Sequence, residues 1–599
     1  MCGLAGHFAY GRNAPPADSA ALALAADAMA PRGPDGRGSW RSDDGRFALA
    51  HLRLAIIDLG ASGAQPMVSA DGRYVVVQNG EIYNFRALRR ELEAEGRVFV
   101  SQSDTEVLLH LYARDGEAMV ERLRGMYAFA IWDNERRGLF LARDPYGIKP
   151  MYYADDGKNL RFASQVKALL AGGGIDTSPA PAGHVGFFIF GYVPEPETLY
   201  RGIRALPAGH TLWIDGDGPR VPRRFFDVGE ELRRAAEGGA RPPDAELLRE
   251  ALVDSVAHHL VSDVPVGVFL SSGLDSTTIA ALAAEHENEG IRTITLGFDE
   301  YKGTPVDETE LAAEVAQQCG AIHDVRWVRR DDFAGEVEHI LAAMDQPTID
   351  GVNTYFVSKA AAEAGLKVAM SGLGGDELFG GYPSFRDIPR VVAALGPLRH
   401  APWLGRGIRV VTEPVIRRLR SPKYAGVLEY GSRPGDAYLL YRAMFMPWEL
   451  PRVLDADLVR EGWRELKALV RLEATIDGLT TPRAMISALE SSWYMRSQLL
   501  RDSDWAGMAH SLEIRVPLVD AELLRRVAPL ITGPLPADKR NMAAAPRTPL
   551  PDSVLDRPKT GFLVPVRDWL AADAGVTERG LRGWARMVYG AHAGTDLLV

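Results

Sequence analysis

The sequence predicts an α/β protein built from two differently patterned parts. Residues 1 to about 210 carry short apolar runs separated by Gly, Asn and Asp, a pattern typical of stacked β-sheets with a few helices. From about residue 245, apolar strands alternate with helical stretches, which predicts a parallel α/β sheet. Beyond about residue 385 the pattern is mostly helical, so we expect a helical extension of the second part.

The elements follow in chain order. In the first part the predicted strands lie in RFALAHLRLAII, RYVVVQ, YAFAIWD and GLFLARD, and ADSAALALAADAMA predicts a helix. The stretch 211–244 is rich in Pro, Arg and Glu without a sustained apolar period, so we interpret it as a linker. In the second part VPVGVFL, IRTITLGF and KVAM predict strands, and TTIAALAAEH predicts a helix. The predicted domains are 1–210 and 245–575, followed by a tail at 576–599.

Composition argues against several classes of protein. Of 599 residues, 46% are hydrophobic and 25% are charged, as in ordinary globular proteins. The net charge of −11 argues against nucleic acid or an anionic membrane as a main partner, because phosphate binding needs clustered Lys and Arg. No apolar run approaches the ~20 residues that span a bilayer, and the first residues lack a signal-peptide pattern. Two cysteines give no disulfide framework, which fits the cytoplasm.

A candidate nucleophile stands at the start of the chain, which opens MCGLAGHFAY. Once the initiator methionine is removed, Cys2 carries both a thiol and a free α-amine, and the amine can act as its base. The other cysteine, Cys319, is expected to be a small core residue near the end of a helix.

Two Gly- and Ser-rich turns in the second part predict a phosphate site. VGVFLSSGLDSTTIAALAAEH places hydroxyls, Gly273 and Asp275 between a strand and a helix, and KVAMSGLGGDELFGGY places Asp376 after another strand. Backbone N–H groups at a helix start bind phosphate oxygens, although the lysine of a Walker A loop is absent. Ligands of parallel sheets bind beyond the carboxyl ends of the strands, so both turns should face one crevice, where Asp275 and Asp376 could share Mg²⁺. Taken alone, the first turn is equally consistent with Ser residues that only cap the helix.

These residues belong to a series of motifs that resembles the glutamine-hydrolysing asparagine synthetases, from Cys2 to about Leu570. The matching pieces of the first part are MCGLAG, RGPDGRG, AHLRLAIIDL, GAQPM, QNGEIYNF, SDTEVLLH, RGMYAFAIWD, RDPYGIKPMYY and FASQVKALL. Those of the second part are SDVPVGVFLSSGLDS, SGLGGDELFGGY, MAHSLEIRVPLVD and RPKTGF. The resemblance implies an N-terminal αββα sandwich glutaminase domain of the N-terminal-nucleophile type and a C-terminal parallel-sheet α/β ATP-pyrophosphatase domain with a helical extension.

In that family the residue that follows the initiator methionine attacks the side-chain amide of glutamine. The resemblance assigns the oxyanion hole to Asn79 and Gly80. An Asn-Gly pair after a strand is also typical of a hairpin turn, so one turn is expected to serve both purposes. Arg53 is expected to bind the glutamine α-carboxylate, and Asp104 with the backbone of Gly80 and Glu81 should hold its α-ammonium.

The resemblance implies that the second domain adenylates a carboxylate with ATP, after which ammonia displaces AMP to give an amide. It also implies an internal tunnel between the domains, in keeping with the need to protect an acyl-adenylate from water. Lys559, in RPKTGF, is expected to neutralise charge on the phosphates. The residues implied for the pyrophosphate are Ser271, Gly273, Asp275 and Ser276, and those for the AMP pocket are Leu270, Leu296, Gly297, Ser371 and Gly372.

Departures from the family pattern leave the acceptor open. Leu373 stands where an acidic residue is usual and Trp505 where Arg is common, whereas Pro31, Ser272 and Gln165 depart beside intact motifs. Aspartate is the first hypothesis for the acceptor. Another carboxylate, such as a sugar acid, a peptide or a biosynthetic intermediate, is the second.

A catalytically silent binding homologue is a third hypothesis, against which the intact reactive residues weigh. The basic run 406–423 is interpreted as a solvated helix face rather than a partner site. A homodimer is expected from the resemblance.

Overall fold

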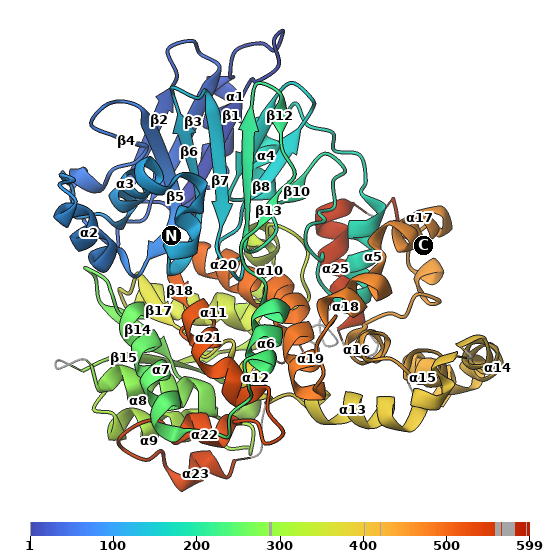
Figure 1. Ribbon diagram of the computed structural model, residues 1–599. Coiled ribbons are helices and arrows are strands. Elements are labelled where there is room, and N and C mark those ends of the chain that lie inside the picture. Colours follow the sequence, from blue (N-terminus) through green and yellow to red (C-terminus); the bar gives the residue numbers. More distant parts are fainter. Residues whose placement is uncertain are drawn as a thin grey trace.

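The computed structural model describes residues 2–286, 290–400, 402–419, 421–557, 565, 569, 581–594 and 596–598. In this part of the chain three β-sheets organise the fold, two in the upper half of Figure 1 and one in the lower half. The upper half is formed by the N-terminal part and the lower half by the C-terminal part. The two predicted parts are therefore distinct layers of one molecule.

The N-terminal part is a sandwich of two antiparallel sheets. In spatial order, the first sheet contains β10 (Arg204–Ala205), β8 (Tyr152–Asp155), β9 (Leu160–Ala163), β1 (Gly3–Phe8), β3 (Phe47–Arg53) and β2 (Gly36–Arg41). The second contains β12 (Gly218–Pro219), β11 (His210–Asp215), β7 (Gly138–Arg143), β6 (Gly125–Asp133), β5 (Tyr74–Ile82) and β4 (Met67–Val68), with β13 (Arg223–Arg224) paired to β11.

Aromatic packing joins the two sheets. The rings of Phe47 in the first sheet and Trp132 in the second are stacked with centroids 4.5 Å apart. Helices α1 (Ser19–Asp27) and α4 (Val166–Gly172) pack on the outer face of the first sheet, and α2 (Phe85–Ala94) and α3 (Asp104–Asp115) pack on the second. The predicted αββα sandwich is confirmed.

The C-terminal part is built on a parallel sheet. Its order is β16 (Ile322–Val328), β15 (Arg292–Phe298), β14 (Val266–Phe269), β17 (Val368–Met370) and β18 (Glu513–Arg515), and every pairing is parallel. The helices from α7 to α12 are α7 (Ala245–His259), α8 (Leu274–Ala284), α9 (Thr309–Gln318), α10 (Arg330–Ala343), α11 (Val352–Glu363) and α12 (Gly375–Phe379). The strand–helix alternation predicted from the sequence is confirmed.

The helical extension is also present. Its first members are α13 (Ser384–Leu395), α14 (Pro402–Leu419), α15 (Val427–Tyr430), α16 (Pro434–Arg442), α17 (Ala456–Leu466), α18 (Ala468–Thr475) and α19 (Pro482–Leu489). They are followed by α20 (Arg501–Met508), α21 (Ala521–Ile531), α22 (Lys539–Ala543) and α23 (Asp552–Leu555). No helix in the described ranges is both long and apolar enough to cross a membrane.

The stretches assigned to a linker and a tail contain regular elements. Within 211–244 lie most of β11, which pairs with β7, and α6 (Val228–Glu237), whose Leu232 is fully buried. The tail region contains α25 (Arg582–Ala593), and its Tyr589 hydroxyl lies 2.7 Å from Nδ1 of His184 in α5 (Pro181–Phe190). The second sheet of the sandwich thus continues beyond residue 210, and the chain's last helix contacts the N-terminal part.

Candidate active site

Cys2 lies directly before β1, whose pairing with β3 sets Gly3 opposite Leu52. The residue is only 8% exposed, and its Sγ lies 4.0 Å from the Leu54 carbonyl oxygen. Burial raises the pKa of the Cys2 thiol, so forming the thiolate near neutral pH requires a base. The free α-amine of a chain that begins at Cys2 would be that base.

Asn79 and Gly80 do not form a turn, and that expectation is wrong. Both lie inside β5, where Asn79 is opposite Ala128 and Gly80 is opposite Tyr127 of β6. Gly80 has a φ of +136°, and a Cβ there would lie 2.0 Å from the Met126 carbonyl oxygen, so no other residue fits. The Asn79 side chain is fully buried, and neither end of its amide has a hydrogen-bond partner among the described residues. A buried amide without partners is the arrangement expected of a ligand-binding donor.

Two buried carboxylates lie close to Asn79 and Gly80: Glu81 in the same strand and Asp104 beside it. Asp104, the first residue of α3, accepts hydrogen bonds from the Ile82 N–H at 2.9 Å and from Gln78 Nε2 at 3.1 Å. Burial raises the pKa of Asp104 to about 6. Burial, and then the nearby Asp104 charge, raise the pKa of Glu81 well above its usual range. A cation between them would favour their ionised forms, which suits the expected α-ammonium.

Arg53 ends β3, next to Cys2 across the β1–β3 pair. Its guanidinium donates to the carbonyl oxygens of Gly60 at 2.7 Å, of Ile57 at 3.3 Å and of Asp58. These bonds fix its orientation, and two of its five N–H donors remain for a carboxylate.

Arg32 joins the nucleophile to the C-terminal part, a role that the sequence analysis missed. Its Nε donates to the Cys2 carbonyl oxygen at 3.1 Å, and its two terminal nitrogens donate to the Asp504 carboxylate at 2.7 and 3.0 Å. Both side chains are buried, and Asp504 lies in α20. The motif RGPDGRG contains Arg32, but no local pattern indicated its partner.

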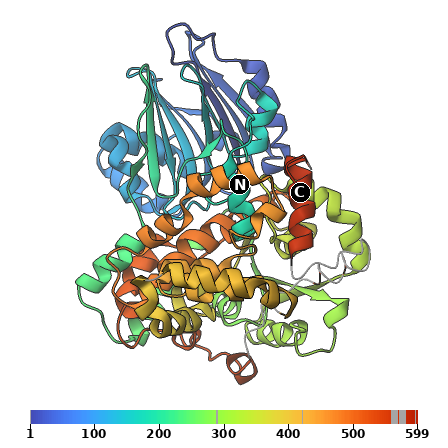
Figure 2. The same cartoon turned by 90° about the vertical axis from the view of Figure 1, so that its right-hand side faces the viewer.

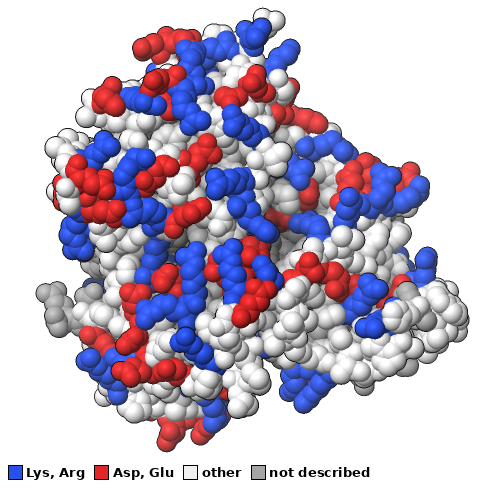
Figure 3. All heavy atoms as spheres, in the orientation of Figure 1, with Lys and Arg blue, Asp and Glu red and all other residues white. Residues whose placement is uncertain are grey.

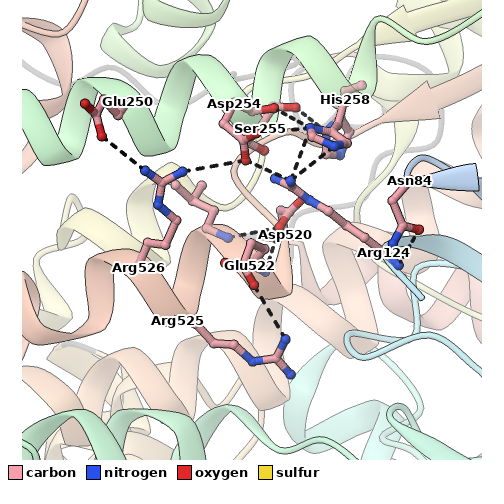
Figure 4. Close-up of polar contacts among 12 residues, drawn as sticks. Asn84, Arg124, Glu250, Asp254, Ser255, His258, Asp520, Glu522, Arg525 and Arg526 are labelled. Carbon is pink, nitrogen blue, oxygen red and sulfur yellow. Dashed lines mark hydrogen bonds and ion pairs between the residues drawn. The ribbon is translucent and has the colours of Figure 1, made fainter. Parts of the chain in front are cut away.

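A second polar contact between the two parts centres on Arg124 (Figure 4). It donates to Asp520, the N-cap of α21, at 2.8 Å and to Asp254 of α7 at 2.7 Å. A cavity of about 260 Å³ lies beside this network, between Tyr146 of the N-terminal part and His259 of α7. None of the predicted site residues lines it.

The two Gly-rich turns of the C-terminal part lie side by side. The first connects β14 to α8 and the second connects β17 to α12, and β14 and β17 are neighbouring strands. The turns touch, since a Cβ on Gly372 would lie 2.8 Å from the Ser276 nitrogen. Within the first turn, the Ser271 and Ser276 hydroxyl oxygens are 2.8 Å apart, and the Gly273 N–H donates to Ser271 Oγ at 3.1 Å.

The residues predicted for AMP gather at the same edge. Leu270 follows β14 and is buried, and its N–H donates to the Ile294 carbonyl oxygen at 2.9 Å. Leu296 and Gly297 lie near the carboxyl end of β15, and the Ser371 N–H donates to the Arg515 carbonyl oxygen at 2.8 Å. The structure therefore brings together every described residue that was predicted for ATP.

Asp275 and Asp376 meet at a lysine that the sequence analysis missed. Lys539, in α22, contacts the Asp275 carboxylate and lies 2.6 Å from Asp376 Oδ1. Burial by itself would lower the pKa of Lys539, but the two carboxylates raise it, so the ammonium stays charged.

The donor set fits Mg²⁺ that is bound together with a nucleotide. Within the described ranges no group of three or more His, Cys, Asp or Glu side chains is placed to hold a metal. Asp275 and Asp376 supply two carboxylates, and Mg²⁺ in nucleotide sites commonly takes one or two carboxylates together with phosphate oxygens. Lys559 lies outside the described residues.

One position that departs from the family pattern, Leu373, lies in the second Gly-rich turn, and two nearby acids were expected to be able to take over its role. Leu373 is half-buried and packs against the apolar core, and Asp345 accepts from the Val166 and Lys167 N–H groups at the start of α4. Glu377 is buried beside Asp376, and Tyr382 donates to its Oε1 at 2.8 Å. Burial, and then the Asp376 charge, raise the pKa of Glu377 to about 7.

Trp505 stabilises a buried acid rather than supplying a charge. Its Nε1 donates to Asp502 Oδ1 at 2.9 Å, and its ring packs against Gly351. Burial, and then the Asp350 charge, raise the pKa of Asp502 to about 7.

Comparison with known proteins identifies both parts. Residues 1–226 match the family model described as a glutamine amidotransferase domain, and residues 247–581 match that described as asparagine synthase. The putative asparagine synthetase [glutamine-hydrolyzing] of Mycobacterium tuberculosis H37Rv is 36% identical, with 96% of this chain and 89% of that protein covered. Asparagine synthetase [glutamine-hydrolyzing] 1 of Bacillus subtilis 168 is 32% identical, and the match covers 95% of this chain and 88% of that protein. Amidase chry2 of Gibberella zeae is 31% identical over 61% of this chain and 56% of that protein. The chain is a glutamine amidotransferase joined to a synthetase, and it belongs to the glutamine-hydrolysing asparagine synthetase family.

Proposed function

We propose that the protein hydrolyses glutamine at Cys2 and transfers the ammonia to a carboxylate that it has activated with ATP, most favourably aspartate, giving asparagine, AMP and pyrophosphate. The observation that carries the proposal is Arg32, which bonds to the Cys2 carbonyl and to Asp504 of the synthetase part. The helix that holds Asp504 leads into β18, which pairs with β17, the strand before Ser371 and Gly372. Nucleophile and nucleotide turns are thus parts of one packed unit.

The first half-reaction needs a proton acceptor and an oxyanion site. The Cys2 thiol gives its proton to the α-amine, and the thiolate attacks the amide carbon of glutamine. The buried Asn79 amide and the Gly80 N–H stabilise the oxyanion, while Arg53 and the Glu81–Asp104 pair hold the two ends of the amino acid. The amide nitrogen takes up a proton and leaves as ammonia, and water then releases glutamate from the thioester.

The second half-reaction takes place at the paired turns. The acceptor carboxylate attacks the α-phosphorus of ATP and pyrophosphate leaves. The hydroxyls of Ser271 and Ser276 and the α8 N-terminus hold phosphate oxygens. When bound by Asp275 and Asp376, Mg²⁺ supplies positive charge to the phosphates, to which Lys539 adds its own.

Ammonia then attacks the acyl carbon, and the nitrogen loses a proton as AMP leaves. Glu377 is the favoured proton acceptor, because its carboxylate is buried beside Asp376 and its pKa of about 7 suits proton transfer near neutrality. Asp345 is unsuited, because its carboxylate binds two N–H groups at the start of α4.

A different carboxylate is the second candidate acceptor. Leu373 presents an apolar side chain where the family has an acid, and Trp505 adds no positive charge. Both changes favour an acceptor that is larger or less polar than aspartate.

Cys2→Ala should lower glutamine hydrolysis and glutamine-dependent amide formation by about 10³-fold or more, because the nucleophile is removed. Synthesis from ammonium chloride should be largely retained, because Cys2 touches neither Gly-rich turn. Glutamate and AMP release would be measured with each nitrogen source. Cys319→Ala, at the C-cap of α9, is the matched control and should change neither rate. Equal loss of both activities in Cys2→Ala would contradict the two-site proposal.

Asp376→Asn and Asp275→Asn, made separately, should each stop AMP and pyrophosphate formation with either nitrogen source. Each substitution removes one of the two carboxylates that would hold Mg²⁺ at the phosphates. Glutaminase activity should survive. Asp387→Asn, in α13, where the side chain is partly exposed and pairs with Arg386, is the control for loss of one carboxylate. If ATP turnover stays at the level of the unmodified protein, the substituted residue does not act in the ATP site.

ATP–pyrophosphate exchange with a panel of carboxylic acids should show robust exchange with aspartate. Leu373→Asp should then change little, because Glu377 already provides the acid. If millimolar aspartate supports no exchange while another acid does, the acceptor is that other carboxylate. Leu373→Asp should then slow the exchange with that acid, because it places a charge in an apolar site.

Glu377→Gln should slow amide formation with ammonia while leaving ATP–pyrophosphate exchange nearly unchanged. In the unmodified protein, the amide-forming rate should rise with pH through about 7, because only the ionised carboxylate accepts a proton. Tyr382→Phe removes a hydrogen bond to the carboxylate, so this rise should move to higher pH. Equal loss of exchange and amide formation in Glu377→Gln would show that Glu377 has only a structural role.

A further inference from the structure

Helix α14 turns its apolar side toward solvent. The exposed fractions are 72% for Trp403, 43% for Leu404, 61% for Val410, 77% for Val411 and 60% for Val415. At about 100° per residue these five side chains share one side of the helix, which we name the α14 apolar face. A solvated helix shows the reverse pattern, because its apolar stripe faces the protein core.

Two charged residues of α14, Arg409 and Glu413, face the protein. Arg409 pairs with Glu429, and its guanidinium lies over the Trp448 ring, 4.3 Å from the centroid. Glu413 is buried and pairs with Arg452 at 3.1 Å. The helix is therefore held by contacts on its polar side, which leaves the α14 apolar face uncovered.

This helix stands apart from both candidate sites. It lies at the right-hand margin of the C-terminal part in Figure 1, and in Figure 2, where that margin faces the viewer, the gold helices of this region are in front. The lower right margin of the molecule is largely without charged side chains in Figure 3. Uncovered apolar patches of this kind mark interaction sites.

Positive charge accompanies the α14 apolar face: at 100° per residue Arg406 and Arg417 lie along one edge of it, and Arg418 lies on the same side at the end of the helix. Arg406 and Arg418 are exposed and make no ion pair in the part of the chain that the structure describes, and Arg417 is 49% exposed. The single acidic residue of α14, Glu413, points inward. Apolar side chains that include Trp, together with Arg and without exposed acids, are the composition of helices that lie in the headgroup region of anionic bilayers.

We propose that α14 attaches the protein to the surface of a bilayer that contains anionic lipid. The α14 apolar face would enter the boundary between headgroups and acyl chains, and Arg406, Arg417 and Arg418 would contact lipid phosphates. A second copy of the chain is a less suitable occupant of the α14 apolar face, because the arginines of its α14 would repel those of the first copy. The net charge of −11 does not prevent attachment, since charges beyond about 10 Å are screened at physiological salt.

The test uses the full chain and vesicles of phosphatidylcholine with or without phosphatidylglycerol, separated by flotation. We expect binding to the anionic vesicles that weakens with salt, and little binding to the neutral ones. The double variant Val411→Glu and Val415→Glu should weaken binding by about tenfold or more, because it places charges in the α14 apolar face.

The matched control is Val98→Glu with Val100→Glu, which adds the same charge at positions that are 77% and 80% exposed in the N-terminal part. It should bind vesicles like the unmodified protein, and the unfolding temperatures of both variants should stay near the original. Absence of binding to anionic vesicles, equal binding to neutral ones, or equal loss in the control would overturn the proposal. So would a dimer in sedimentation velocity that only the α14 variant dissociates, because the face would then be a contact between copies.

Discussion

The ion pair between Arg32 and Asp504 is the contact on which the two-site arrangement depends. Arg32 donates to the carbonyl oxygen of Cys2 in the N-terminal part and to the Asp504 carboxylate of α20 in the synthetase part. Both charges are buried, so loss of either partner would leave an uncompensated charge at a cost of about 3–5 kcal/mol. The backbone of Cys2 and helix α20 are therefore tied to one another through a single side chain. In the proposed reaction, ammonia formed at Cys2 would be released beside the contact that joins the two parts.

Lys539 plays the corresponding part in the synthetase site. Asp275 and Asp376 follow different strands, and without a cation between them their charges would repel. Glycine makes the approach possible, since a Cβ on Gly375 would lie 2.2 Å from Asp275 Oδ1 and one on Gly381 would lie 1.9 Å from Asp376 Oδ1. The carboxylates are thus preorganised for positive charge, which Lys539 provides in the protein alone and which Mg²⁺ with a nucleotide would share.

The sequence predicted features whose causes are local. The strand–turn–helix pattern around Ser271 located the β14–α8 turn, because Gly, Ser and apolar periodicity act over a few residues. The position of Asn79 and Gly80 was misjudged, because an Asn-Gly pair favours a turn unless a distant strand pairs with both residues, as β6 does. Arg32 and Lys539 were missed for a related reason. Their partners, Asp504 and Asp275, are far away in the sequence, and no local pattern encodes such contacts.

In the proposed reaction, the choice of acceptor depends on two positions at which this chain lacks a charge that is usual in the family. A zwitterionic acceptor such as aspartate needs partners for an α-ammonium and an α-carboxylate as well as for the carboxylate that reacts. Leu373 and Trp505 each replace a charge that is usual in the family. The buried carboxylates of Asp502 and Asp350 lie at Trp505, and that of Glu377 lies beside Asp376. Carboxylates with a pKa of about 7 become ionised when a cation binds beside them, so they suit an ammonium better than an anion. In the proposed reaction, these carboxylates would therefore suit the ammonium of the acceptor.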